Sequence, residues 1–114
     1  MQAAPSLDRM FEALADPTRR ALVERLSRGP ASVSELANPF AMSLPAIVQH
    51  LQRLEQSGLI TTQKVGRTRT CSIDTGALSL VEKWINDRRM GWEKRLDRLG
   101  AFLDAKDAKG ATGK

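Results

Sequence analysis

The chain has 114 residues, a formal net charge of +5 and a pI near 10, with 41% hydrophobic and 27% charged residues. These values indicate one globular domain that favours an anionic partner, and no apolar run is long enough to cross a bilayer. Residues 1–6 lack the basic and apolar regions of a signal peptide, so we expect a cytoplasmic protein. The single cysteine, Cys71, excludes an internal disulfide and an all-cysteine zinc site within one chain.

Three short helices are predicted in the first 40 residues. The apolar residues Leu7, Met10, Phe11 and Leu14 recur at helical spacing, so a first helix should run from residue 6 or 7 to 15. Asp16 and Pro17 form an N-cap and first-turn pair that starts a second helix, 17–27. A very short third helix, 35–38, should begin at Ser34. Phe40 and Met42 follow it and are expected to fill the core.

The stretch 43–58 predicts a helix with a clear start and end. Ser43 is a good N-cap, Pro45 suits a first turn, and Gly58 suits a left-handed C-terminal position. One arc of the helix is apolar and should face the core: Leu44, Ile47, Val48, Leu51 and Leu54. The opposite arc contains no acid and holds Pro45, Ala46, Gln49, His50, Gln52, Arg53 and Gln56.

Amide and guanidinium groups on such an arc suit base edges and phosphates. The alternative is an ordinary solvent-exposed face that happens to lack acids. His50 lies at the flank of the arc, and the sequence favours a DNA contact and a packing or capping role equally for this residue.

A basic β-hairpin is predicted directly after this helix. Residues 59–64 and 69–73 are rich in Ile, Thr and Val, and Gly66 supplies the turn between them. Residues 61–70 contain three cations, Lys64, Arg67 and Arg69, and no acid, whereas residues 1–60 hold six of each sign. We therefore predict a mainly α, winged helix-turn-helix fold whose hairpin tip reaches the DNA backbone or minor groove. The alternative is an edge hairpin that its cations protect from aggregation.

A long last helix, from about residue 77 to 104, is predicted from an apolar stripe: Val81, Trp84, Ile85, Trp92, Leu96, Leu99 and Leu103. This stripe exceeds what a small winged helix can cover, so we predict a homodimer through the first and last helices. Its interface should contain Leu7, Met10, Phe11, Leu14, Trp84, Trp92, Leu96 and Leu99. The alternative is a helix folded back on its own domain. Residues 1–106 would form one DNA-binding and dimerisation domain, and 107–114 a flexible tail.

Four motifs together resemble the ArsR-type winged-helix transcriptional regulators: LADPTRRALVERL at 14–26, SVSELA at 32–37, MSLPAIVQHLQRLEQSGLI at 42–60 and GRTR at 66–69. The resemblance covers nearly the full length, and residues 84–99 resemble a subgroup without a characterised metal. It implies a homodimeric repressor of double-stranded operator DNA. By position, Ser43, Pro45, Ala46, Gln49 and His50 would face DNA, and Arg67 and Arg69 would be wing cations. The charge pattern adds Arg53 and Lys64 as phosphate contacts.

The sequence gives no support for a metal, a cofactor or catalysis. The family's cysteine-rich metal motif is absent at 34–37, and His50 is the only histidine. There is neither a Gly-rich phosphate loop nor a nucleophile beside a plausible base. We expect Cys71 to be a buried structural thiol, with a redox switch as the lesser alternative. The competing class is a winged-helix module that docks a protein partner instead of DNA. A small-molecule inducer stays open.

Overall fold

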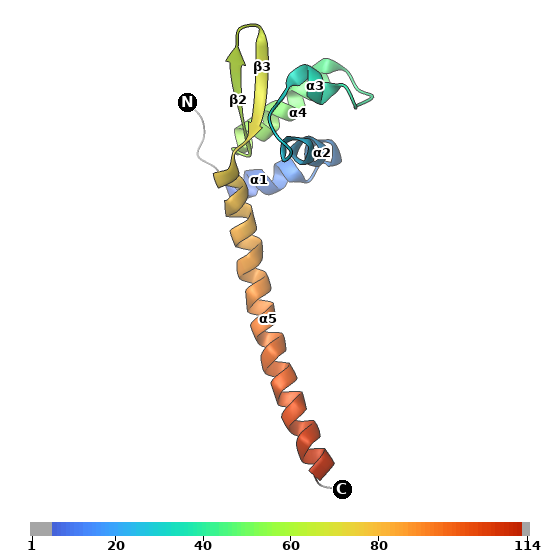
Figure 1. Ribbon diagram of the computed structural model, residues 1–114, viewed down its shortest axis with the longest axis vertical. Helices are drawn as coiled ribbons and strands as arrows, with labels where there is room; N and C mark the ends of the chain where they lie inside the picture. The colour runs from blue at the N-terminus through green and yellow to red at the C-terminus, as the bar shows by residue number, and fades with distance from the viewer. Residues whose placement is uncertain (1–5, 113–114) are drawn as a thin grey trace. The chain divides into compact units, whose positions relative to one another are not determined.

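The computed structural model describes residues 6–112, with side chains described as far as residue 106. Its compact first unit, Met1–Val81, contains the helices α1 (Leu7–Leu14), α2 (Pro17–Leu26), α3 (Val33–Ala37) and α4 (Leu44–Ser57). It also contains the strands β1 (Ala31–Ser32), β2 (Ile60–Val65) and β3 (Thr68–Ile73), and the first turns of α5 (Thr75–Thr112). The predicted fold class is therefore confirmed: a mainly helical winged helix-turn-helix with a small antiparallel sheet (Figure 1).

The predicted junction between α1 and α2 is confirmed in detail. Asp16 is the N-cap of α2, and its Oδ2 accepts a hydrogen bond of 3.0 Å from the backbone N–H of Arg19. Pro17 occupies the first turn, where its missing N–H removes no intrahelical bond. Both helices end one residue earlier than the sequence predicted.

The third helix begins earlier than predicted, because its cap is Ser32 and not Ser34. The Ser32 side chain accepts from the backbone N–H of Glu35, and the Glu35 carboxylate accepts from the backbone N–H of Ser32. This reciprocal capping box fixes the start of α3 at Val33. The two residues before the helix form β1, which pairs with β3 through Ala31 opposite Cys71 and Ser32 opposite Thr70. The sheet therefore has three strands, in the order β1-β3-β2, where the sequence predicted two.

Helix α4 has the predicted start and end. The Ser43 side chain caps its N-terminus, and Gly58 ends it in a left-handed conformation with φ of 88°. Ile47, Leu51 and Leu54 are buried, as predicted from their shared arc. Two residues of the arc differ: Leu44 is 53% exposed, because the first residue of the helix precedes the part that packs on the core, and Val48 is half-buried and lies outside the core. Met42 is likewise exposed rather than buried, whereas the neighbouring Phe40 packs against the core.

The hairpin forms at the predicted place, with its strands shifted by one residue. β2 and β3 pair from Ile60 opposite Ile73 to Val65 opposite Thr68. Gly66 takes the tight turn with φ of 63°, a left-handed conformation that favours glycine. Figure 1 shows this turn at the outer end of the hairpin, which stands beside α3 and α4. Near the other end of the hairpin, Ile60 and Cys71 enter the core that α1, α2, α3 and α4 share.

Helix α5 starts at Thr75, about two residues before the predicted start, and is longer than predicted. The Asp74 side chain accepts from the backbone N–H of Ala77, so Asp74 is the cap, and Val81 is the last α5 residue in the core. The second unit, Glu82–Lys114, is the rest of this helix, which continues to Thr112. The segment predicted as a flexible tail from residue 107 is helical as far as Thr112, and residues 113–114 lie outside the described part.

Candidate nucleic-acid interface

The outward face of α4 is polar and carries no carboxylate. Of the residues predicted to contact DNA, Ser43, Pro45 and Gln49 are exposed and Ala46 is half-buried. The Ser43 hydroxyl accepts from the backbone N–H of Ala46 at 3.3 Å, and no acid lies in the first turn. The positive end of the helix dipole therefore remains available to a phosphate.

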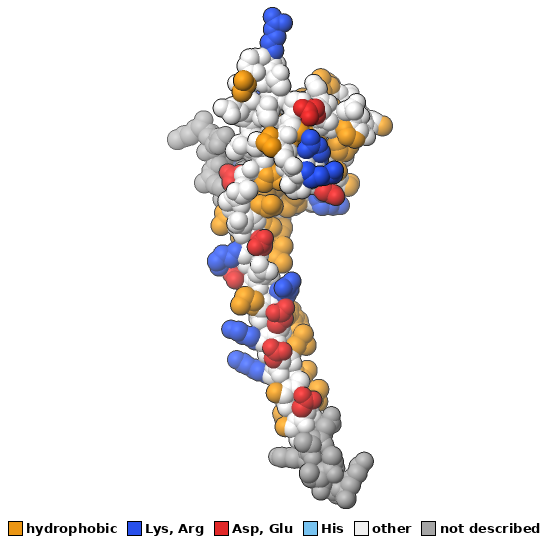
Figure 2. Space-filling view, viewed as in Figure 1, with side chains coloured by type: hydrophobic (Ala, Val, Ile, Leu, Met, Phe, Trp, Pro, Cys, Tyr) orange, Lys and Arg blue, Asp and Glu red, His pale blue; other side chains and the backbone are white. Residues whose placement is uncertain are grey.

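The hairpin places its cations at and beside the turn. Lys64 on β2 lies directly opposite Arg69 on β3, and Arg67 lies in the turn between the strands. All three are exposed, and among the described residues neither Lys64 nor Arg67 forms an ion pair. Figure 2 shows cationic side-chain atoms at the outer end of the hairpin with no acidic side chain beside them. This end of the wing is suited to an anionic partner.

A hydrogen-bonded chain turns the only carboxylate of α4 toward the wing. Glu55 is half-buried and accepts a hydrogen bond from the Thr62 hydroxyl on β2. Thr62 in turn accepts from the Arg69 guanidinium at 3.0 Å. The chain crosses a groove of about 500 Å³ between α4 and the hairpin. The chain holds the carboxylate of Glu55 beside β2 and the guanidinium of Arg69 on the side of the wing that faces α4.

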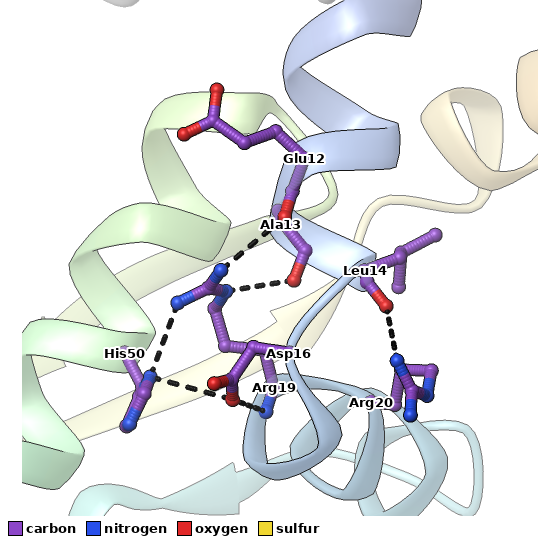
Figure 3. A network of polar contacts seen from close by, with 7 residues as sticks. All are labelled: Glu12, Ala13, Leu14, Asp16, Arg19, Arg20 and His50. Carbon is purple, nitrogen blue, oxygen red and sulfur yellow. Dashed lines mark hydrogen bonds and ion pairs between the residues drawn. The ribbon is translucent and has the colours of Figure 1, made fainter.

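His50 contacts Arg19 of α2 and Asp16, the N-cap of that helix, and its predicted DNA contact stays a prediction. Its Nδ1 lies 3.3 Å from Arg19 Nη1 and 3.8 Å from Asp16 Oδ2, and the residue is half-buried (Figure 3). The pKa of Asp16 is lowered, first by the backbone N–H of Arg19 and then by the charges of His50 and Arg19. His50 thus links α4 to the start of α2.

Arg19 is a structural residue of the same network that sequence analysis did not single out. Its Nε donates to the carbonyl of Ala13 at 2.7 Å and its Nη2 to that of Glu12 at 3.2 Å, while Arg20 donates to the carbonyl of Leu14 (Figure 3). The last turn of α1 contains no basic side chain of its own. The two arginines of α2 therefore satisfy the free carbonyls at the end of α1.

Arg53, predicted as a DNA contact, has an acid from another helix beside it, which the sequence did not indicate, and its DNA contact stays a prediction. Its Nη1 is 3.1 Å from Oε1 of Glu12 on α1. The sequence shows that α4 has no acid on this arc, but it does not show which residues of α1 lie next to α4. The guanidinium of Arg53 therefore lies next to α1.

The residues predicted at a dimer interface divide into two groups. Met10 has no exposed surface and lies in the core of its own chain, so it cannot contact a partner as predicted. Leu7 and Leu14 pack partly on the same core, and Phe11 is exposed at the surface. The α5 residues Trp84, Trp92, Leu96 and Leu99 are all exposed, Trp92 by 63%. Figure 2 shows hydrophobic side chains along one side of this helix and cationic ones along another.

Cys71 lies inside the core and is inaccessible from solvent. It has no exposed surface, and burial is the first cause that raises the pKa of its thiol, followed by the charge of Glu55. Both effects keep the thiol protonated and unreactive. No helix in the described part of the chain combines the length and apolar character that a membrane span requires.

Comparison with known proteins places this architecture in a defined class. A family model described as a helix-turn-helix domain matches residues 14–63. The chain is 36% identical to the HTH-type transcriptional regulator Rv2034 of Mycobacterium tuberculosis over 92% of this chain and 95% of that protein. It is 30% identical to the transcriptional repressor SdpR of Bacillus subtilis, over 69% of this chain and 88% of that one. The model also matches a crystal structure of an ArsR family transcriptional regulator with a TM-score of 0.72 and 54% identity, over 76% of this chain and 96% of that one.

The fold and the interface together define a winged helix-turn-helix protein that binds DNA. The chain belongs to the ArsR-type family of transcriptional regulators, as its sequence motifs predicted. A second match, an ArsR-like transcriptional regulator from Rhodococcus sp. RHA1, has a TM-score of 0.68 and 31% identity over 82% of this chain and 88% of that one. The names of these relatives describe regulators of transcription.

Proposed function

We propose that the protein is a homodimeric repressor that acts in the cytoplasm and binds a double-stranded operator. Helix α4 enters the major groove and the β2–β3 hairpin contacts the adjacent backbone or minor groove. The observation that carries this proposal is the absence of carboxylates from both surfaces, since Glu55 is held between α4 and the wing. Repression is favoured because the name of the relative SdpR describes a transcriptional repressor.

The contacts divide by chemistry. Gln49 is the exposed side chain of α4 best suited to a base edge, because its amide can pair with adenine in two hydrogen bonds. Ser43, Pro45 and Ala46 are small and let the start of the helix approach the DNA closely. Lys64, Arg67 and Arg69 are proposed to neutralise phosphates, which fixes orientation without reading sequence.

In the proposed dimer, the second chain contacts the second half-site of the operator. The exposed apolar stripe of α5, with two tryptophans, is larger than scattered surface hydrophobics and is typical of an interaction surface. In the first unit, the exposed Phe11 on α1 is proposed as a separate part of the dimer contact, together with the partly buried Leu7 and Leu14. Two α4 helices related by a two-fold axis would then reach successive major grooves about 34 Å apart.

The first experiment selects bound fragments from random duplex DNA and repeats the selection with Gln49→Ala. We expect a pseudo-palindromic sequence for the native protein and a relaxed preference for the variant, by about 1–3 kcal/mol at the affected base pair. Gln56→Ala, two turns further along the same helix, is the matched control and should leave the preference unchanged. No enriched sequence at all would contradict the proposal and favour a module that docks proteins.

The second experiment measures the molar mass of Trp92→Ala by light scattering. Loss of this large, exposed aromatic side chain should convert dimers to monomers at micromolar concentration. Met90 is also exposed, but it lies on the other side of α5, about 160° away at 100° per residue. Met90→Ala should therefore stay dimeric. A dimer that persists in Trp92→Ala, or is lost equally in both variants, would refute the proposed interface.

A further inference from the structure

A cleft of about 430 Å³ lies between α1, the start of α2 and α4, and the DNA-binding role does not use it. Its lining contains three arginines, Arg9, Arg19 and Arg53, and a single carboxylate, Glu12, together with Ala13, Gln56 and Ser57. Three positive charges against one negative give the lining a formal net charge of +2. A concave site of this volume with converging cations is suited to a small anion.

The three arginines differ in how many hydrogen-bond and ion-pair partners each already has within the protein. Arg19 donates to two backbone carbonyls and contacts His50, but no described carboxylate forms an ion pair with it. Arg9 is exposed and forms no hydrogen bond or ion pair with any residue in the described range. Arg53 has one partner, Glu12. Asp16, outside the lining, offsets part of the charge of Arg19. Arg9 has no acidic partner among the described residues, so the cleft still holds positive charge that the protein does not fully neutralise.

The pair of Glu12 and Arg53 is the kind that a ligand can replace. Their side chains are 66% and 61% exposed, so water screens the attraction between them and the pair is weak. A guanidinium binds a carboxylate or phosphate through two parallel hydrogen bonds, which is stronger than one contact to a mobile surface glutamate. A multivalent anion would gain Arg9 and Arg53 together and release Glu12 to solvent.

We propose that this cleft binds a small free organic anion with at least two negative charges, such as a dicarboxylate, a tricarboxylate or a phosphate ester. Arg9 and Arg53 bind the charged groups of the anion, and the positive charge of Arg19, which also lines the cleft, attracts the anion. Arg53 and Gln56 belong to α4, whereas Arg9 and Glu12 belong to α1. An occupied cleft therefore changes the contact between α1 and the helix that enters the DNA, which makes the anion a regulator of DNA binding. Only this last step rests on the proposed function.

The proposed dimer surface leaves the cleft accessible along α1. Arg9 is about 160° from Phe11 around that helix, at 100° per residue. A DNA phosphate is the other source of the same chemistry. The cleft favours a free anion, because it is hollow and lies at the second half of α4, whereas Ser43 and Gln49 are on the first half.

The test is calorimetric titration of the full chain, without DNA, with citrate and with inorganic pyrophosphate at constant ionic strength. We expect one anion per chain, with affinity reduced about tenfold in Arg9→Gln and in Arg53→Gln. Glu12→Gln removes the competing carboxylate and should raise the affinity about threefold or more, a gain that misfolding cannot produce. Arg28→Gln and Glu24→Gln make the same charge changes at exposed sites outside the cleft, and should alter the affinity less than about twofold.

Three results would overturn the proposal. The first is no saturable binding of either anion up to about 10 mM. The second is an equal effect of the cleft variants and their controls, which would indicate general attraction to a basic protein. The third is citrate that leaves DNA binding unchanged while Arg9→Gln weakens it, which would assign the cleft to a DNA phosphate. If citrate binds as expected but no operator sequence is selected, the proposed anion site is supported and only the proposed DNA-binding function is refuted.

Discussion

Removal of the two unpaired wing cations, Lys64 and Arg67, should weaken DNA binding and reduce its dependence on salt. Each phosphate that a cation neutralises contributes about −0.9 to the slope of log affinity against log salt concentration. The double variant Lys64→Ala/Arg67→Ala removes two cations per chain and four per proposed dimer, so the slope should flatten by about 3.6. Between about 50 and 200 mM salt, the native protein should then lose about 150-fold more affinity than the variant.

Fluorescence anisotropy with a labelled duplex measures this slope directly. We expect the loss on both the selected operator and an unrelated duplex, because phosphate contacts carry no sequence information. Arg28→Ala/Lys94→Ala removes the same charge from exposed positions outside the interface and should leave the slope nearly unchanged. A slope flattened by about 1.8 would mean that the wing of only one of the two chains contacts DNA. An unchanged slope in the wing variant would refute the assignment of the hairpin.

The remaining predictions concern stability and reactivity. Asp16→Ala should lower the free energy of unfolding by about 1 kcal/mol in urea denaturation, and Asp16→Asn by much less, because Asn can keep the cap. Since the backbone N–H of Arg19 lowers the pKa of Asp16, this carboxylate stabilises the fold above its ordinary pKa of about 4, and the effect is lost as the pH falls through the lower folded value. Asp16→Asn should therefore show a smaller loss of stability in acid than the native protein. Cys71 should react with iodoacetamide only after unfolding, and rapid alkylation of the native protein would contradict its burial.

Features that depend on residues close in sequence could be predicted correctly. The cap at Ser43, the left-handed Gly58 and the turn at Gly66 each follow from one residue type at one position. The apolar arc of α4 was correct at Ile47, Leu51 and Leu54. It was not correct at Leu44, which is exposed at the start of the helix, or at Val48, which is half-buried and lines the groove beside the hairpin. Local signals were therefore sufficient for the winged helix-turn-helix.

Features that depend on distant residues could not be predicted. Strand β1 has two residues, too few for any periodic pattern, and it exists because β3 presents free backbone groups opposite Ala31. The same limit affects the candidate site. Glu12 is 41 residues from Arg53, and no pattern within α4 indicates that an acid from α1 lies beside it.

The pair of Lys64 and Arg69 combines both kinds of information and bears most directly on function. The sequence indicates that both are basic, but only the register of the sheet places them directly opposite each other on neighbouring strands. Like charges at opposed positions destabilise a hairpin by up to about 1 kcal/mol, and neither residue has a carboxylate partner among the described residues. Such a pair is unfavourable for an isolated hairpin, and becomes favourable when a polyanion lies along both strands. Protection of a sheet edge from aggregation requires a cation, but it does not require two that face each other beside an acid-free helix.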